Sequence, residues 1–399
     1  MEDTKKYILL QNGYSVSYTE SDDSQCLVNE NKYTKQDGDT RTGKEIAECL
    51  KNKLYDTFLK KHYKNIVVLT AAGTSLDNGD KDRCGKTRDG LWAECQTEID
   101  AFKNKIVDLE DKPFYKGKDI EGLLSYIVLY EKINGVITND RDESLKGFLE
   151  NKISKSCILD LQEQAPHKDF LNKITARKNN DVRVQLFTTN YDTLFEQAAN
   201  KAGFVVIDGF SFTQPREFAG KWFDLDIVNR EKTRLKQEES FLSKVFHLYK
   251  LHGSLNWTKE NDKIIQKDNS DRPLIIYPAS EKYESSYEQP YFEMMSRFQQ
   301  ALRKEETLLI VVGFGFQDKH IKSVIVEAVE QNPSFQLLIV NYNGNGSISA
   351  DNLDEFFSDK EKMKVKRSIN IIFDKFKDFT DKYPENQTYI IKEKENEAV

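Results

Sequence analysis

Asn65-Ile66-Val67-Val68-Leu69-Thr70, followed by Ala71-Ala72-Gly73, is the stretch of sequence that decides the fold. The first part is a short, almost unbroken apolar run, and small residues follow it directly. A continuous run, as opposed to an alternating one, is typical of a strand buried on both faces of a sheet. The stretch therefore predicts a strand of a parallel sheet that is covered by helices.

Comparable apolar runs recur along the chain. They lie at residues 184–187, 205–207, 274–277, 308–312 and 337–340. Helical patterns separate several of them, which is the arrangement of βαβ units. We therefore expect an α/β protein with a Rossmann-type parallel sheet and helices on both faces.

Three regions do not fit the strand-and-helix repeat. Residues 1–62 combine short β-type runs with one amphipathic stretch, which predicts a hairpin and helix appended to the core at 63–345. Residues 93–181 contain no convincing strand but several amphipathic stretches, so we expect a helical insertion there. Residues 346–399 are predicted to form a C-terminal helical extension.

Composition excludes several classes of protein. The 399 residues are 38% hydrophobic and 31% charged, with a net charge of -7. That balance favours a globular protein and gives no basic field for bulk attraction to nucleic acid or an anionic membrane. No run approaches the ~18 apolar residues of a spanning helix, and no apolar leader follows the first residues. We expect a cytoplasmic protein.

The cysteines predict neither a metal site nor a disulfide framework. There are five, with no C-x-x-C pair: Cys26, Cys49, Cys84, Cys95 and Cys157. A zinc ribbon needs paired, closely spaced thiolates, so no zinc ribbon and no metal are expected.

The first candidate motif is the turn Ala71-Ala72-Gly73-Thr74-Ser75, directly after the first strand. Small residues at such a turn let backbone N–H groups approach a pyrophosphate. They also serve close packing, and the motif alone does not distinguish the two.

Two further motifs have equally plain alternatives. Gly90-Leu91-Trp92 ends a polar loop that could cover a ligand, although a surface loop anchored by its Trp is the better default. Thr188-Thr189-Asn190-Tyr191-Asp192 follows the second run. Its Asn could orient a ribose hydroxyl or a water, and the same residue types also cap helices.

A histidine and two more strand ends complete the set. His252, between Leu251 and Gly253, is a candidate general base because its pKa lies near the working pH. The chain has four other histidines, His62, His167, His247 and His320. The turns at 313–318 and 341–343 follow consecutive strands and suit an adenosine moiety, or are ordinary loops.

In this order the motifs resemble those of the sirtuin family, over about residues 65–345. The family elements G-A-G-x-S, G-L-W, T-x-N-x-D, L-H-G, G-x-S and I-N are similar to residues 71–75, 90–92, 188–192, 251–253, 313–315 and 340–341. The ordered set is more specific than any member.

The resemblance implies an NAD site in the core and a role for each matching residue. It implies that Asn190 holds the nicotinamide ribose and positions water, that Asp192 supports the nicotinamide pocket, and that His252 is the base acting at the ribose. It implies contacts with the rest of NAD from Ala72, Gly73, Ser75, Thr189, Gly313, Gly315 and Asn341.

Departures from the family pattern suggest which branch is closer. Ala71 stands in place of the first glycine and Gly315 in place of the usual serine, and the paired-cysteine zinc knuckles of the deacylases are absent. The runs at 251–257 and 313–320 are similar to the bacterial antiphage-defence branch. That resemblance implies NAD degradation, a homo-oligomer and, for some members, a HerA-type ATPase partner.

Three functions remain open at this point. The first is an NAD glycohydrolase that cleaves the nicotinamide–ribose bond to give nicotinamide and ADP-ribose. The second is an NAD-dependent protein deacylase, which needs a peptide groove. The third is a non-catalytic sensor of NAD or ADP-ribose that regulates a partner.

Overall fold

Most of the apolar runs become neighbouring strands of one large sheet. The computed structural model describes residues 5–20, 24–138, 144–178, 181–229, 241–268, 270, 273–275, 289–342, 352–359 and 361–385. Within them the main sheet has the strand order β4-β3-β2-β1-β16-β13-β12-β5-β6-β9-β7. Its core strands are β5 (Asn65–Thr70), β6 (Gln185–Thr188), β7 (Val205–Ile207), β9 (Val245–Lys250), β12 (Thr307–Val312), β13 (Gln336–Val340) and β16 (Ile369–Ile372).

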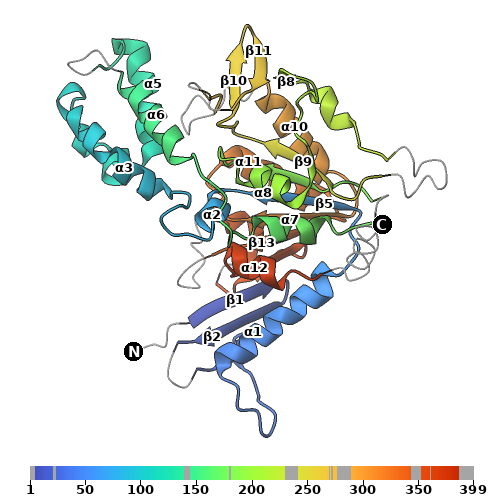
Figure 1. Ribbon diagram of the computed structural model, residues 1–399. Helices are drawn as coiled ribbons and strands as arrows, with labels where there is room; N and C mark the ends of the chain where they lie inside the picture. Colours follow the sequence, from blue (N-terminus) through green and yellow to red (C-terminus); the bar gives the residue numbers. More distant parts are fainter. Residues whose placement is uncertain are drawn as a thin grey trace.

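The predicted α/β class is confirmed. From β16 to β7 every pair of neighbouring strands is parallel, and helices lie on both sides of the sheet (Figure 1). Along β12, Leu308 and Ile310 belong to one apolar core and Leu309 and Val311 to the other. Both faces of this strand are buried, which explains why its apolar run does not alternate.

Different helices cover the two faces. The first core contains residues of α7 (His167–Thr175), α8 (Leu194–Ala202) and α12 (Phe376–Lys382). The second contains residues of α10 (Tyr291–Leu302) and α11 (Lys319–Gln331).

The N-terminal residues extend the sheet instead of standing beside it. We call residues 5–62 the N-terminal addition. Its elements are β1 (Lys5–Gln11), β2 (Tyr14–Thr19), β3 (Cys26–Val28), β4 (Asn31–Lys32), α1 (Gly43–Leu54) and a π-helical turn, η1 (Tyr55–Leu59). β1 pairs antiparallel with β16 on one side and with β2 on the other. The four strands therefore continue the core sheet at its lower edge (Figure 1).

The prediction of a helical C-terminal extension was wrong for its central part. Residues 369–372 form β16, which pairs parallel with β13 and lies inside the sheet. The sequence there, Ile-Asn-Ile-Ile, is a short β-branched run of the kind that favours a buried strand. The predicted core boundary at residue 345 thus falls before one of the sheet's own strands. Residues 386–399 lie outside the described part.

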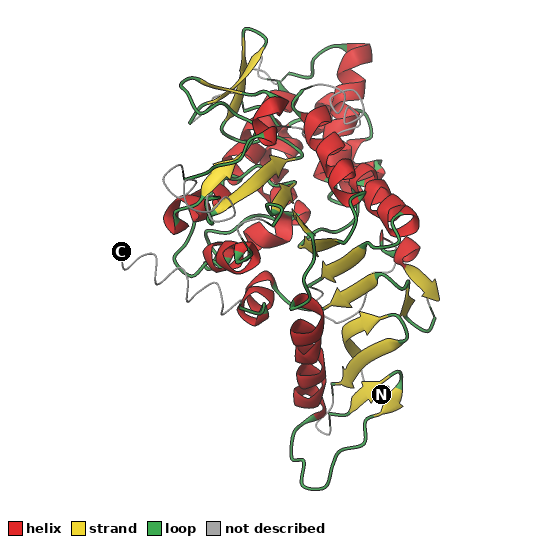
Figure 2. Cartoon of the chain, turned by 90° about the vertical axis from the view of Figure 1, so that its right-hand side faces the viewer, coloured by secondary structure: helices red, strands yellow, loops and turns green. Residues whose placement is uncertain are grey.

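The helical insertion is shorter than predicted and begins earlier. It comprises α3 (Arg88–Ala101), α4 (Pro113–Lys116), α5 (Ile120–Asn134) and α6 (Leu145–Ser156), with the short 3-10 turns η2 (Lys103–Lys105) and η3 (Leu109–Asp111). The helices project away from the sheet (Figures 1 and 2). We call residues 88–156 the helical insertion. α7 lies within the predicted range, yet it packs on the sheet.

Two local interpretations in this region also need correction. Residues 90–92 belong to helix α3 and not to a surface loop, and Trp92 is buried in the core of the helical insertion. Residues 158–161, which lie in the range predicted as a helical insertion, form no helix, and the next helix begins at His167. Leu161 instead packs into the core of the sheet.

The predicted run at 274–277 is only partly described, and β9 is a strand of the main sheet that was not among the predicted runs. Residues 276 and 277 of the 274–277 run lie outside the described part, and Ile275 forms only an isolated bridge with Gly253. β9 takes a place between β6 and β7. A smaller sheet contains β8 (Arg216–Glu217), β10 (Trp257–Glu260) and β11 (Lys263–Gln266). Among the described helices, none is both long and apolar enough to cross a membrane.

Candidate functional site

Two glycines bring the start of the short helix α2 (Ala72–Leu76), which follows β5, into contact with the turn after β12. The N–H of Gly73 donates to the carbonyl of Gly313 at 3.1 Å. A Cβ on Gly73 would lie 2.5 Å from the Cα of Gly313, and Gly313 has a φ of +68°. Any side chain here would push the two turns apart, so both positions require glycine. Because parallel strands end at one edge of the sheet, the other turns meet in the same place.

Asn190 joins the turn after β6 to Ala71 and helix α2, which follow β5. Its Nδ2 lies 3.0 Å from the carbonyl of Ala71, 3.1 Å from Thr74 Oγ1 and 2.8 Å from Ser75 Oγ. The amide N–H groups are thereby committed to the protein. The carbonyl oxygen, Oδ1, accepts no hydrogen bond from any residue that the structure describes, and the side chain is half-buried. This oxygen is the acceptor that Asn190 can offer to a ribose hydroxyl or a water.

Ser75 and Asp192 face each other in the interior. Ser75 Oγ donates to Asp192 Oδ2 at 2.5 Å, and the N–H of Leu194 donates to Asp192 Oδ1 at 3.1 Å. Ser75 is 4% exposed and Asp192 is 7% exposed. The Ser75 hydroxyl is therefore engaged inside the protein, where it holds Asp192 and Asn190, and it is not displayed toward a phosphate. Asp192 also steadies the start of α8, so part of the capping alternative holds.

Lys250 stabilises the loop that holds Asp192. The sequence pattern did not assign it this role. Lys250 is the last residue of β9 and is 2% exposed. Its ammonium donates to the backbone carbonyl of Asp192 and lies 3.0 Å from Glu196 Oε1. A buried ammonium needs such partners. The signal in the sequence for this role was the position of the lysine, two residues before the candidate base His252.

His252 meets an acidic partner from another strand end. Its Nε2 lies 3.2 Å from Asp318 Oδ2, and both side chains are largely buried, at 16% and 9% exposed. Asp318 Oδ1 accepts the N–H groups of His320 at 3.0 Å and Ile321 at 3.3 Å, so the same carboxylate caps α11. Asp318 lies in the motif at 313–318, but nothing in the sequence pattern assigns it a role. Its place just before an amphipathic helix was the signal for the cap alone.

The remaining predicted residues lie at the same edge, nearer the surface. Ala72 and Gly315 are exposed, and Thr189 and Asn341 are half-buried. A Cβ on Gly315 would meet no atom within 4 Å, so the missing serine side chain leaves open space. The N–H of Thr189 donates to the carbonyl of Thr70, and that of Asn341 to Ile372, which keeps both turns on the sheet.

Other titratable groups near these strands are buried and take no part in the site. Burial lowers the pKa of His247 to about 4, and its Nδ1 lies 3.1 Å from the Tyr249 hydroxyl. Burial, helped by the charge of Asp192, raises the pKa of the Cys157 thiol to about 12. An ordinary thiol so protected stays protonated and unreactive at neutral pH.

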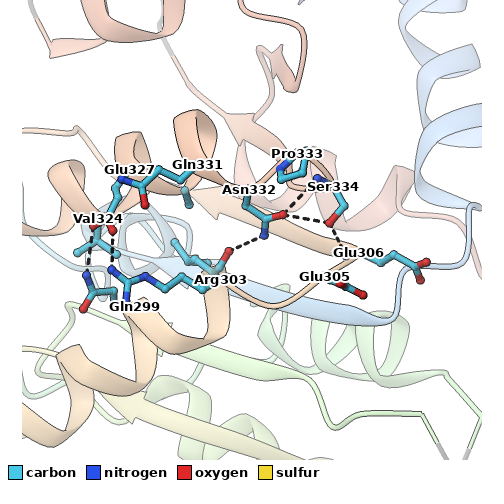
Figure 3. A pocket seen from close by; sticks show the side chains of 12 residues that line it. Gln299, Arg303, Glu305, Glu306, Val324, Glu327, Gln331, Asn332, Pro333 and Ser334 are labelled. Carbon is cyan, nitrogen blue, oxygen red and sulfur yellow. Dashed lines mark hydrogen bonds and ion pairs between the residues drawn. The ribbon is translucent and has the colours of Figure 1, made fainter.

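A pocket of about 440 Å³ lies at the opposite end of the sheet (Figure 3). It lies between α10 and α11, beside the residues that precede β12 and β13. Several of its polar groups pair with one another: Arg303 pairs with Glu327 at 2.5 Å, and Asn332 Oδ1 accepts from Ser334 Oγ at 3.0 Å. Ligands of open α/β sheets bind at the carboxyl ends of the strands. We therefore assign the site to the edge that holds Asn190 and His252.

No group of three or more His, Cys, Asp or Glu side chains suited to a metal ion occurs among the residues that the structure describes.

Comparison with known proteins gives one match to a protein family and several distant matches to solved structures. No curated protein matches the sequence. The solved structure described as "The Structural basis of Sirtuin Substrate Affinity" aligns with a TM-score of 0.36 at 12% identity, over 84% of this chain and 96% of that one. "Structural Basis for the Mechanism and Regulation of Sir2 Enzymes" aligns with a TM-score of 0.35 at 11% identity, over 86% and 98%. The sequence of residues 184–362, which includes Asn190, His252 and Asp318, is similar to the SIR2-like domain.

Proposed function

We propose that this protein is an NAD glycohydrolase that splits NAD and water into nicotinamide and ADP-ribose. The observation that carries the proposal is the position of two groups that follow the neighbouring strands β6 and β9 at one edge of the sheet. Asn190 Oδ1 accepts from none of the described residues, and His252 has one ring nitrogen 3.2 Å from Asp318. The similarity of residues 184–362 to the SIR2-like domain supports NAD as the substrate.

The chemistry needs little more than positioning and one base. The C–N bond breaks with its electron pair going to the nicotinamide nitrogen, which neutralises the pyridinium, so the leaving group needs no acid. The ribose passes through an oxocarbenium-like state, as in glycoside hydrolysis. Water attacks the ribose carbon and its proton passes to the His252 imidazole, while Asn190 Oδ1 orients the water or a ribose hydroxyl. The products are nicotinamide, ADP-ribose and one proton.

The residues at the edge fit the rest of NAD. Gly73 and Gly313 carry no side chain that would hold a pyrophosphate away from the backbone, and the open space at Gly315 suits the adenosine half. A helical insertion with its own apolar core follows the turn at 71–75, and the sequence has no C-x-x-C pair of the kind that holds a zinc ribbon. These features favour water over an acyl-lysine as the acceptor.

The test is release of nicotinamide by the purified full-length protein given NAD alone. We expect Asn190→Ala and His252→Ala each to lower kcat by about 10²-fold or more, because each removes a group acting at the ribose. His62→Ala is the matched control, since His62 is 64% exposed and precedes β5, at the opposite end of that strand from the site. It should keep full activity.

Two results would replace the proposal with an alternative. NAD consumption only in the presence of an acylated peptide would make the protein a deacylase. Binding of NAD without any nicotinamide, in wild type and variants alike, would make it a sensor.

We further propose that the activity serves antiphage defence by depleting NAD in the cytoplasm. The support is the resemblance of the runs at 251–257 and 313–320 to the defence branch. Such an enzyme must stay silent until triggered, so we propose a homo-oligomer that a HerA-type ATPase can engage. Light scattering after size exclusion tests this assembly. A monomer both alone and with a co-expressed ATPase of that type would contradict it.

A further inference from the structure

Asp318 makes two separable contacts with its two carboxylate oxygens. Oδ1 accepts the N–H groups of His320 and Ile321 and caps α11. Oδ2 lies 3.2 Å from His252 Nε2. The two residues come from the ends of β12 and β9, and β5 and β6 lie between those strands in the sheet. The contact therefore reaches across the edge that holds the other site residues.

The chemistry of the pair fixes where the imidazole carries its proton. An ionised carboxylate has only acceptor atoms, so a proton on Nε2 is favoured over a lone pair that would face the Asp318 oxygen 3.2 Å away. A neutral imidazole carries one proton, which leaves Nδ1 with its lone pair free. Nδ1 has no hydrogen-bond partner among the described residues. The ring is thus held in one tautomer with one basic nitrogen available, as an aspartate does for the histidine of a Ser-His-Asp triad.

We propose that Asp318 is the positioning residue of the site, which sets the tautomer and orientation of His252 so that Nδ1 is the base. The role rests on the proposed function as far as catalysis is concerned, whereas the tautomer can be measured without any substrate. Asp318 touches no reacting atom itself. It acts through His252. Oδ2 faces the imidazole while Oδ1 caps α11, so the carboxylate links the ring to the first turn of that helix.

Asp318→Asn separates the two contacts. Only the carbonyl oxygen of the new amide can accept the N–H groups of α11, and Asn is as good an N-cap as Asp. The cap therefore turns the amide NH₂ toward His252. An NH₂ group donates, so it favours an unprotonated Nε2 and moves the proton to Nδ1, where it blocks the base. The fold is retained while the tautomer is reversed.

Asp318→Ser gives the matched comparison. Serine also caps helices well, but it is too short to reach His252, so the ring is released to sample both tautomers. We expect kcat for nicotinamide release to fall in the order wild type, Asp318→Ser, Asp318→Asn, with a loss on the order of 10²-fold or more in the last. KM should change little, because the change affects the base. The melting temperatures of the two variants should agree within a few degrees.

Long-range ¹H–¹⁵N spectra of the histidine-labelled full-length protein provide the second readout, with His252 assigned by His252→Gln. We expect the proton on Nε2 in wild type and a shift toward Nδ1 in Asp318→Asn. A wild-type proton on Nδ1 would overturn the proposal whether or not the protein cleaves NAD. So would an Asp318→Asn variant whose kcat stays within about threefold of wild type. If wild type cleaves no NAD but shows the expected tautomers, the proposed function fails and the positioning of His252 stands.

Discussion

The N-terminal addition and the helical insertion are attached to the same sheet in opposite ways. The N-terminal addition donates strands to the sheet, and Ile46, Ala47 and Leu54 of α1 belong to the main apolar core. The helical insertion keeps a separate core, in which every buried member lies between residues 92 and 153. Segments that share a core unfold together, whereas a segment with its own core can open by itself. The difference therefore concerns cooperativity as well as shape.

A buried charge cluster reinforces the attachment of the N-terminal addition. Lys51 of α1 is fully buried, and its ammonium lies 2.8 Å from Asp374 Oδ1 and 3.0 Å from Glu48. Asp374 also accepts from the Tyr55 hydroxyl at 2.7 Å and pairs with Lys382 at 3.1 Å. Because Asp374 follows β16, the cluster fixes α1 to the C-terminal part of the sheet.

The largest effect should come from Asp374→Ala. The change leaves the Lys51 ammonium buried with fewer partners, which costs about 3–5 kcal/mol of unfolding free energy. Urea unfolding should show one transition at lower denaturant. Asp381→Ala is the control, because Asp381 pairs with Lys377 at the surface, where an ion pair is worth about 1 kcal/mol or less. Equal midpoints for the two variants would show that the cluster does not hold the N-terminal addition.

The next effect should be confined to the helical insertion. Leu149 is fully buried in its core, and Leu149→Ala should cost about 2–5 kcal/mol. We expect this loss to appear as local opening of the helical insertion while the main unfolding transition stays in place. Phe148→Ala, at the neighbouring exposed position, is the control and should change little.

Two cysteines report the opening of each region separately. Cys26 lies in the N-terminal addition and Cys95 in the helical insertion, both are buried, and burial raises the pKa of each thiol to about 11. In a protein whose other cysteines are serine, Leu149→Ala should speed thiol labelling of Cys95 at least about 30-fold, the equivalent of 2 kcal/mol. Labelling of Cys26 should not change. Equal acceleration at both would show one cooperative unit.

The sequence predicted most strands of the parallel core, because a strand buried on both faces needs apolar residues at successive positions and so appears as a continuous apolar run. It failed where partner strands decide the structure. Residues 369–372 lie beside charged residues, and only their pairing with β13 and β1 makes them a strand. Trp92 was misinterpreted for a similar reason. An aromatic residue after a polar loop is compatible with a surface anchor, and only the packing of α5 and α6 with α3 makes it part of a core.

For the site, the sequence indicated which residues follow strands at one edge of the sheet, but not which side chains contact one another. The motifs placed Asn190, Asp192 and His252 at one edge because each follows a strand. The sequence could not indicate that the Ser75 hydroxyl donates to Asp192, or that Asp318, which follows another strand, lies next to His252. Such contacts depend on the order of strands in the sheet, which no local pattern contains.

The smallest of the effects separates the two regions by pH. His167 packs between Phe195 and Phe376, and burial lowers its pKa to about 3. In the unfolded chain its pKa is about 6.5, so between these values the unfolded state binds more protons and unfolding becomes easier as pH falls. At pH 5 the loss amounts to about 2 kcal/mol, and it is absent above about pH 7.

His167→Phe should remove this part of the acid sensitivity, which urea unfolding at pH 7 and pH 5 measures. His62→Gln, a change at an exposed histidine, should leave the wild-type difference intact. Residues 88–156 contain no histidine, so the Cys95 labelling rate, corrected for thiolate content, should not gain a matching acid dependence. The N-terminal addition is tied by Lys51 to Asp374, just before α12, whose Phe376 contacts His167. Acid should therefore lower the unfolding free energy of the sheet together with the N-terminal addition and leave that of the helical insertion unchanged. If acid accelerates Cys95 labelling to the same extent, the two regions unfold in one event.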